Sequence, residues 1–238
     1  MPLPILGPDA CQFFRVLAAN NDRTWFRAER AHYETAVLHP IQALALTLAP
    51  AMRAIDPAFD VEPAPGHAVS RIYRDMRFAR PGTGPLREAA WLVFLNRSLR
   101  DTVPPAYFLE VTADGYRFGM GFYSLPAWRA AQVRAAIDRE PARLRTAAQA
   151  ALGIPGLSLQ GPLYVRPKGA RVPPDIRTWY ERKCAHVEVG GTPAELGEPG
   201  LSARVIGVFH RLAPLYTFWR DSGSAGPDPA REARPPEG

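Results

Sequence analysis

The amino-acid sequence predicts an α+β domain, with helices grouped at both ends of a central, largely antiparallel sheet. Apolar residues recur with a helical period over the first quarter of the chain, alternate or form short runs between residues 69 and 123, and return to a helical period after Pro126. The pair Asp114-Gly115 between two alternating segments is a strong β-hairpin signal. Helices that flank a sheet in this order are typical of the α+β class.

Three helices are expected before the sheet. Asp9 and Gln12 resemble a capping box that opens the first helix, and Asn20 and Asn21 follow its last residue. Pro40 suits the first turn of the third helix, because the N–H that proline lacks is not needed there. The expected helices cover residues 9–19, 24–38 and 40–55.

The sheet and the helices that follow it are predicted from the same change of period. The hairpin is expected at the centre of the sheet, and Pro214 is expected to kink the last helix. The expected strands cover residues 69–75, 89–95, 107–112, 116–123 and 184–189. A helix that contains Ala130, Val133 and Ile137 is expected after Ser124-Leu125-Pro126, and further helices are expected at residues 141–152, 176–183 and 201–220.

We expect a single domain over residues 1–220 and a disordered tail over residues 221–238. With 238 residues, 47% of them hydrophobic, the chain can bury a sizeable core. The tail has no aliphatic side chain larger than alanine, so it cannot bury enough surface to fold and is expected to be dispensable. Because the formal net charge is +6 and the tail carries −2, the domain carries +8.

A cytoplasmic location is expected. Cys11 and Cys184 are the only cysteines, too few for a disulfide framework. The N-terminus lacks a basic stretch followed by a long apolar run, and no segment approaches about eighteen uninterrupted apolar residues. The sequence therefore predicts neither secretion nor a membrane span.

Arginine is concentrated in one part of the chain. Residues 71–100 hold seven arginines and two acids, and 27 of the 29 basic residues in the chain are arginines. Guanidinium groups match phosphate and carboxylate oxygens bidentately, so an exposed cluster suits an anionic ligand. The candidate ligand-binding residues are Arg71, Tyr73, Arg74, Asp75, Arg77, Arg80, Arg87 and Lys168, the last because its loop could bring an ammonium group toward the arginines.

An internally paired or solvated cluster is the competing interpretation. An arginine-rich composition weakens the case for each single arginine, and isolated surface ion pairs are common and weak. If residues 71–77 form a strand, Asp75 shares a face with Arg71 and Arg77 and lies between them. Its carboxylate would stay ionised and orient the arginines rather than donate a proton.

The other motifs predict no metal and no cofactor. Gly119-Met120-Gly121 lacks the third glycine and the strand-to-helix position of a dinucleotide site, and we expect something to pack closely against its backbone. Cys184, His186 and Glu188 alternate along a predicted strand, but no fourth metal ligand accompanies them. No GxSxG elbow is present. Asn20 and Asn21 favour a left-handed turn over amide contacts to a ligand.

Several of these segments together resemble the domain of unknown function 2461 family. They are Asn20-Asn21 with Trp25-Phe26, the motif Arg71-x-x-Arg74-Asp75-x-Arg77-Phe78, Gly119-x-Gly121-x-Tyr123 and Pro167-Lys168-Gly169. The resemblance extends from about Phe13 to Trp219. It implies a single α+β domain and brings no catalytic assignment. The chain departs from the family pattern at Leu86, where a tyrosine is usual, so a role that needs a phenol there is not expected.

The leading hypothesis is a domain that binds an anionic partner, either a phosphate- or carboxylate-bearing small molecule or an acidic protein segment. An enzyme that acts on a phosphorylated or carboxylated substrate at the same site is the second hypothesis, with the arginines neutralising developing charge. Nucleic-acid binding is the third, favoured by the +8 charge of the domain but not by any recognised motif.

Overall fold

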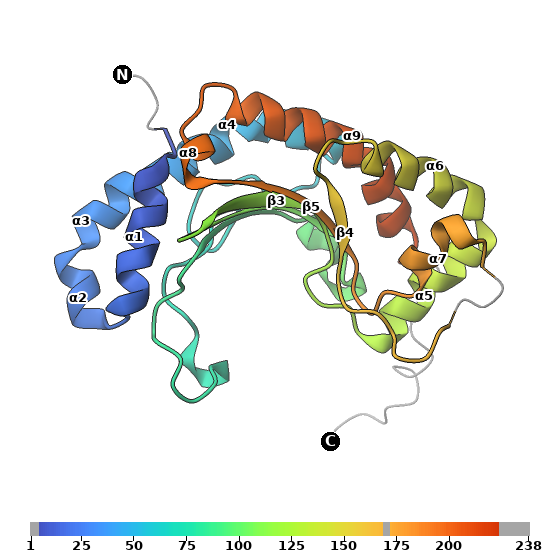
Figure 1. The fold of residues 1–238 in the computed structure, drawn as a ribbon, viewed down its shortest axis with the longest axis horizontal. Coiled ribbons are helices and arrows are strands. Elements are labelled where there is room, and N and C mark those ends of the chain that lie inside the picture. Colours follow the sequence, from blue (N-terminus) through green and yellow to red (C-terminus); the bar gives the residue numbers. More distant parts are fainter. Residues whose placement is uncertain (1–4, 169–171, 224–238) are drawn as a thin grey trace.

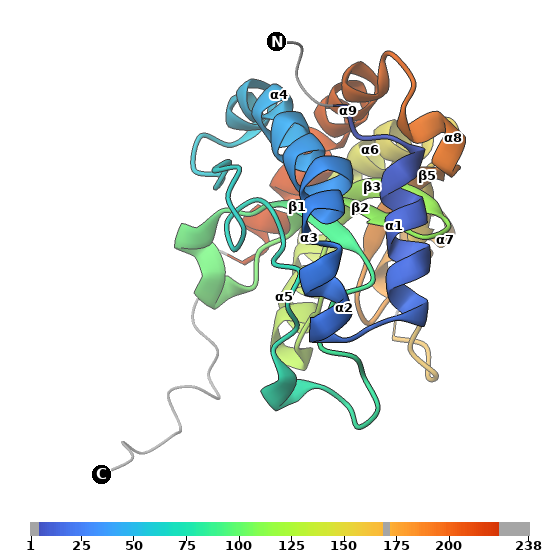
Figure 2. The ribbon, with the colours of Figure 1, turned by 90° about the vertical axis from the view of Figure 1, so that its left-hand side faces the viewer.

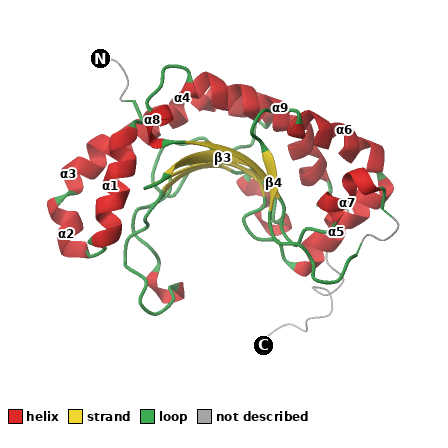
Figure 3. Ribbon diagram, in the orientation of Figure 1, coloured by secondary structure: helices red, strands yellow, loops and turns green. Residues whose placement is uncertain are grey.

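The computed structural model describes residues 5–168 and 172–223. Its centre is a five-stranded antiparallel sheet with the strand order β1-β2-β3-β5-β4, which confirms the predicted α+β class and the hairpin at the middle of the sheet (Figure 3). The strands are β1 (Ala90–Phe94), β2 (Ala106–Thr112), β3 (Gly115–Gly121), β4 (Ser158–Gln160) and β5 (His186–Gly191).

Helices cover one face of the sheet and both of its ends. In Figure 1, α4, α8 and α9 lie along the outer face of the curved sheet, α1 to α3 lie at one end and α5 to α7 at the other. The α-helices are α1 (Pro8–Ala19), α2 (Arg23–Ala28), α3 (Arg30–Tyr33), α4 (His39–Ile55), α5 (Ala127–Arg139), α6 (Pro141–Leu152), α7 (Pro174–Tyr180), α8 (Pro193–Leu196) and α9 (Leu201–Asp221). A π-helical turn, Glu34–Leu38, joins α3 to α4, and 3-10 turns occur at Met76–Phe78 and Arg97–Thr102.

The N-terminal helices differ from the prediction in their caps. The capping box of Asp9 and Gln12 is wrong, because α1 begins one residue earlier, at Pro8, and the Asp9 carboxylate instead lies 3.2 Å from the His32 imidazole. The expected helix over residues 24–38 is broken near Glu29 into α2 and α3. Asp22 caps α2 by accepting hydrogen bonds from two backbone N–H groups.

The predicted strand over residues 69–75 is wrong. This stretch makes only isolated bridges, Val69 with Pro65 and Leu92, and Tyr73 with Leu86, and it leads into the 3-10 turn at Met76–Phe78. Two short elements, β4 and α8, were not expected, because three or four residues carry too little periodicity to be recognised. The strand expected at 184–189 begins two residues later, at His186.

The core lies between the sheet and the helices α4 and α9. The Tyr107 ring of β2 packs 4.9 Å from Phe209 and 5.4 Å from Tyr216, both on α9. The buried Asp56, after α4, accepts a 2.6 Å hydrogen bond from the Tyr216 hydroxyl and one from Asn96. Burial opposes ionisation of Asp56, but these hydrogen bonds outweigh it and lower the pKa of the carboxyl. The ionised Asp56 therefore ties α4 to α9.

One helical stretch, Arg30–Ile55, has the length and apolar composition that could cross a membrane. Half of its most apolar 18-residue segment is buried inside the domain, where Leu44, Leu48 and Met52 contribute to the core. Core helices of this kind pass the same test of length and hydropathy, so this stretch is weak evidence for a span.

Two glycines of β3 permit the curvature of the sheet. A Cβ added at Gly119 would overlap the backbone carbonyl of Val187 on β5, and one at Gly121 would overlap His186. The close packing expected against this motif is therefore confirmed, and the packing partner is the neighbouring strand. The two strands can approach this closely on the inner face only because no side chain lies there.

The end of the domain lies beyond the predicted boundary at residue 220. Asp221 completes α9 and pairs with Arg143 at 2.6 Å, and Ser222 is buried. The Ser222 hydroxyl accepts a hydrogen bond from Arg129, a fully buried guanidinium. Burial lowers the pKa of Arg129 to about 10. Residues 224–238 of the expected tail lie outside the described residues.

Replacement of Gly119 tests whether the close approach of β3 and β5 sets the curvature. Gly119→Ala should lower the free energy of unfolding by about 1 to 3 kcal/mol, because the added methyl group forces the two strands apart. The control is Gly207→Ala, at an exposed position of α9 with no atom within 4 Å, which should raise stability by up to about 1 kcal/mol. Equal effects of the two changes in urea unfolding would contradict this account.

Two truncations test the boundary of the domain. A chain that ends at Arg220 should unfold more easily by about 2 kcal/mol, because it removes the Ser222 acceptor of the buried Arg129. A chain that ends at Gly223 should keep nearly full stability, since residues 224–238 have no large apolar side chain. Thermal unfolding of both chains measures the difference, and equal stabilities would show that Asp221 to Gly223 are dispensable.

Candidate functional site

The inner face of the sheet carries no covering helix in Figure 1. Along each strand, side chains alternate between this face and the core, and those directed to the core are fully or almost fully buried. The residues that face away from the core are only partly buried for the most part. We call this surface the open sheet face; its residues are Trp91, Val93, Phe108, Glu110, Arg117, Gln160, His186 and Glu188.

Arg117 occupies the centre of the open sheet face. Its Nε donates to Glu110 on β2, and its Nη1 donates to Glu188 on β5 at 2.6 Å. Burial opposes the charge of Arg117, but the two glutamates outweigh it and raise the pKa of the guanidinium. The guanidinium also lies 5.7 Å from the centre of the Phe108 ring. The centre of the face is therefore internally paired.

His186 lies beside this network. Its Nε2 is 3.3 Å from the Glu188 carboxylate oxygen that also accepts from Arg117. Burial lowers the pKa of His186, with the charges of Arg117 and Arg182 acting in the same direction and Glu188 opposing them. The imidazole is therefore mostly neutral at pH 7. The charged groups beside it on the open sheet face are Glu110, Arg117 and Glu188.

Residues 71–87 form an arm that projects from the β1 side of the sheet (Figures 1 and 2). We call this segment the arginine arm. Its two limbs are joined by the backbone hydrogen bonds Arg74 N to Pro85 O and Arg87 N to Ile72 O, both 2.8 Å. The side chain of Asn21 binds both the N–H and the carbonyl of Leu86. The left-handed turn expected at the asparagines is wrong, because Asn20 ends α1 with a φ of −134°.

Three of the candidate residues are engaged within the arginine arm. Arg74 directs Nε to the carbonyl of Gly84 at 3.3 Å and Nη2 to that of Leu86 at 3.4 Å. Asp75 caps the 3-10 turn and pairs with Arg77 through two side-chain hydrogen bonds, of 3.0 and 2.6 Å. These bonds lower the pKa of Asp75. Asp75 therefore orients one arginine, not two, because residues 71–77 are not a strand.

The remaining arginines of the arm have no acidic partner among the described residues. Arg71 lies against Gly66, and Arg80 is exposed. Arg87 is half-buried, with its guanidinium carbon 5.8 Å from the centre of the Trp91 ring. The Nε of Arg87 is buried and has no hydrogen-bond partner among these residues. Tyr73 packs edge-on against Phe26 at 5.6 Å and keeps 47% of its surface exposed.

Lys168 is not brought to the arginine arm. Its loop lies beside α7, at the opposite end of the sheet in Figure 1. The Lys168 backbone N–H binds the Glu181 carboxylate, and its ammonium lies 5.6 Å from the centre of the Tyr164 ring. Arg134 approaches the same ring at 5.2 Å. The eight candidate residues therefore divide between two ends of the sheet.

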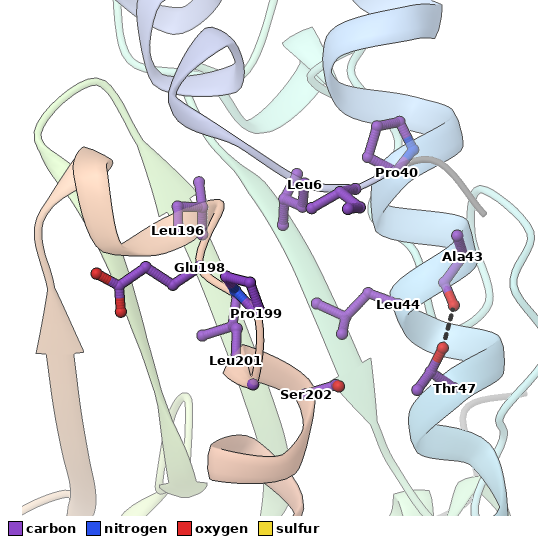
Figure 4. A pocket seen from close by; sticks show the side chains of 12 residues that line it. Leu6, Pro40, Ala43, Leu44, Thr47, Leu196, Glu198, Pro199, Leu201 and Ser202 are labelled. Carbon is purple, nitrogen blue, oxygen red and sulfur yellow. Dashed lines mark hydrogen bonds between the residues drawn. The ribbon is translucent and has the colours of Figure 1, made fainter. Parts of the chain in front are cut away.

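An apolar cavity on the outer side does not suit an anion. It lies between α4 and the turn that joins α8 to α9, and Figure 4 shows Leu6, Leu44 and Leu201 directed into it. Its volume is about 210 Å³, below the usual size of a site for a small molecule. Glu198 is its one charged lining residue, and a carboxylate repels an anionic ligand.

One group of side chains among the described residues has the geometry to approach a metal. Potential ligand atoms of Asp60, Glu62 and His67 lie within 4.8 Å of one another. The Arg97 guanidinium already binds the Asp60 carboxylate oxygen nearest to His67, and this positive charge opposes a second cation. Of the alternating residues Cys184, His186 and Glu188, Glu188 already pairs with Arg117, and the Cys184 thiol donates to the carbonyl of Phe122.

These features define an α+β domain with helices on one face of a curved antiparallel sheet, an open sheet face of paired charges and aromatic rings, and an arginine arm at its border. The chain belongs to the DUF2461 family of conserved hypothetical proteins, whose family model matches residues 9–218. The resemblance in the sequence motifs is thereby confirmed. No curated protein and no solved structure matches the chain.

The pairing of Glu110 with Arg117 was missed in the sequence, although a signal for it exists. The Asp114-Gly115 turn sets the register of the hairpin, and that register places Glu110 directly opposite Arg117. The contribution of Glu188 could not be found in this way, because β5 is 71 residues from Arg117 along the chain.

Replacement of Arg117 tests whether the network contributes to stability. Arg117→Met should lower the free energy of unfolding by about 2 kcal/mol, because it leaves two carboxylates on one face without their cation. The triple variant Arg117→Met, Glu110→Gln, Glu188→Gln should recover part of the loss. Arg30→Met, which removes an exposed helical ion pair, is the control and should change stability by less than about 0.5 kcal/mol. A triple variant no more stable than the single one would refute the network.

Proposed function

We propose that the protein binds an anionic ligand or partner, carrying a phosphate or carboxylate group, where the arginine arm meets the open sheet face. The observation that carries this proposal is Arg87, whose buried Nε has no partner among the described residues. A buried donor without an acceptor is unfavourable, and a ligand oxygen would satisfy it.

Two further arginines strengthen the positive potential of the arm. Arg71 and Arg80 have no acidic partner among the described residues, and Arg74 is bound only to carbonyl groups. Within residues 71–87 the one acid is Asp75, which is occupied by Arg77. An anion therefore meets uncompensated positive charge on this side of the sheet.

The two alternative functions have less support. A catalytic role needs a titratable group within reach of the bound anion. The carboxylates nearest to Arg87 are already engaged, because Glu110, opposite Trp91 in register, pairs with Arg117, and Glu88 accepts a hydrogen bond from Asn21. A nucleic-acid backbone that crossed the open sheet face would meet the carboxylates of Glu110 and Glu188. Binding of a compact anion is favoured over both. Cytoplasmic location remains a prediction.

The test is the thermal stability of the protein in different anions at constant ionic strength. Phosphate, sulfate and citrate should raise the melting temperature above its value in chloride, because a ligand that binds only the folded state adds about 2.7 kcal/mol at a hundred times its dissociation constant. Arg87→Gln should abolish the rise and leave the unliganded protein folded, as judged by circular dichroism.

The matched control is Arg77→Gln. It removes the same charge from the same arm, but at an exposed arginine that Asp75 already pairs. This variant should keep the anion-dependent rise. The proposal fails if no anion stabilises the wild type more than chloride does, or if both variants lose the rise equally, because loss of net charge alone would then explain the effect.

A further inference from the structure

A second arginine with an unmet donor lies beside the end of β4, at the edge of the sheet opposite β1. Arg182 is half-buried and directs Nη1 to the carbonyl of Gly161. Its Nε is buried without a hydrogen-bond partner among the described residues, and none of their carboxylates pairs with it. Burial lowers the pKa of this guanidinium. A cation in such a position lacks the acid that usually compensates it.

The imidazole of His186 is the titratable group next to Arg182. Arg182 binds the carbonyl of Gly161, the residue after Gln160, and Gln160 lies opposite His186 in the register of β4 and β5. The Arg182 charge also acts to lower the pKa of His186. The nearest acid, Glu188, is shared with Arg117, which binds the same carboxylate oxygen more closely, at 2.6 Å against 3.3 Å. Both carboxylates of the network, Glu110 and Glu188, bind Arg117, and neither pairs with Arg182.

His186 is bordered by polar and aromatic groups on the open sheet face. In register, His186 lies between Gln160 on β4 and Gly121 on β3. The backbone of Gly121 lies directly against His186, and the amide of Gln160 is a polar group on the same face. The Phe108 ring lies 6.2 Å away, edge to face with the imidazole. About a quarter of the His186 side chain is exposed.

We propose that Arg182 and His186 form a second anion-binding site, which takes the phosphate or carboxylate group of a small molecule. Arg182 supplies its free Nε donor, and His186 binds in its protonated form, in which both ring nitrogens donate. This site is separate from Arg87, because β2 and β3 lie between β1 and β5. It does not depend on the function proposed for the arginine arm.

Binding at this site is coupled to the protonation of His186. An anion favours the imidazolium, so it raises the pKa of His186, and it binds more tightly as the pH falls toward that pKa. The other groups that face His186 are Glu188, Arg117, Arg182, Gln160 and Phe108. Carboxylates and guanidinium groups keep their charge near neutral pH, so the pH dependence in this range belongs to the imidazole.

The experiment follows the imidazole signals by NMR while sodium sulfate is added at constant ionic strength. Sulfate is the probe because its own charge does not change near neutral pH, and His186→Gln identifies the signal. The pKa of His186 should rise by about 1 at saturating sulfate, which corresponds to a tenfold preference for the protonated form. Sodium phosphate and acetate then compare the two classes of anion.

Arg182→Gln should abolish the response of His186 to sulfate. Lys183→Gln removes the same charge from the adjacent, exposed position and should leave the response intact. Arg182→Lys keeps the charge but not the Nε donor, and it should weaken the response; this variant serves if Arg182→Gln does not fold. The site is refuted if sulfate leaves the His186 signals of the wild type unchanged, or if Arg182→Gln and Lys183→Gln respond alike.

The same measurement in Arg87→Gln separates the two sites. That variant should keep the His186 response even though it loses the binding proposed for the arginine arm. A response that disappears in Arg87→Gln would mean that one anion near the arm controls both ends of the face, and it would overturn the separate site.

Discussion

The close approach of β3 and β5 on the inner face of the sheet is the constraint on which the rest of the structure depends. Only glycine fits at residues 119 and 121, because a Cβ there would overlap the neighbouring strand. The sheet curves accordingly, and α4 and α9 pack on its outer face (Figure 1). No helix covers the polar side chains of the inner face, and Glu110, Arg117 and Glu188 pair with one another across the strands.

The charges of the open sheet face follow from this arrangement. At the centre, Arg117 is held between two glutamates, which compensate its charge. At the two ends, Arg87 and Arg182 each keep one buried Nε without an acceptor among the described residues. The centre thus holds two carboxylates and one guanidinium, whereas the arginines near the two ends lack an acid, and this distribution agrees better with the small anions proposed at the borders than with a polyanion that crosses the face.

In the arginine-rich stretch, the local alternation of residues does not predict the secondary structure. Residues 71–77 alternate like a strand, yet a strand needs a neighbour with free backbone groups, and only Leu86 bridges to Tyr73. The arm is held instead by Asn21, which is 65 residues from Leu86 along the chain. Asp75 was expected between Arg71 and Arg77 because the side chains of alternate strand residues share a face. Residues 71–77 do not form a strand, so this prediction is wrong. Lys168 could not be placed from the sequence for the same reason, since nothing local specifies which end of the sheet its loop joins.

The sequence by itself determined the α+β class, the Asp114-Gly115 hairpin, most of the long helices and the family, because period, turn residues and motifs act over a few neighbouring positions. It also located a concentration of arginine. Only the tertiary structure decided which arginines are paired, since Arg77 finds its acid two residues away, Arg117 finds one of its acids on a distant strand, and Arg87 and Arg182 find none among the described residues. The pairing of a charge depends on distances of a few ångströms between segments that are far apart in the chain, and these distances exist only after the sheet has folded.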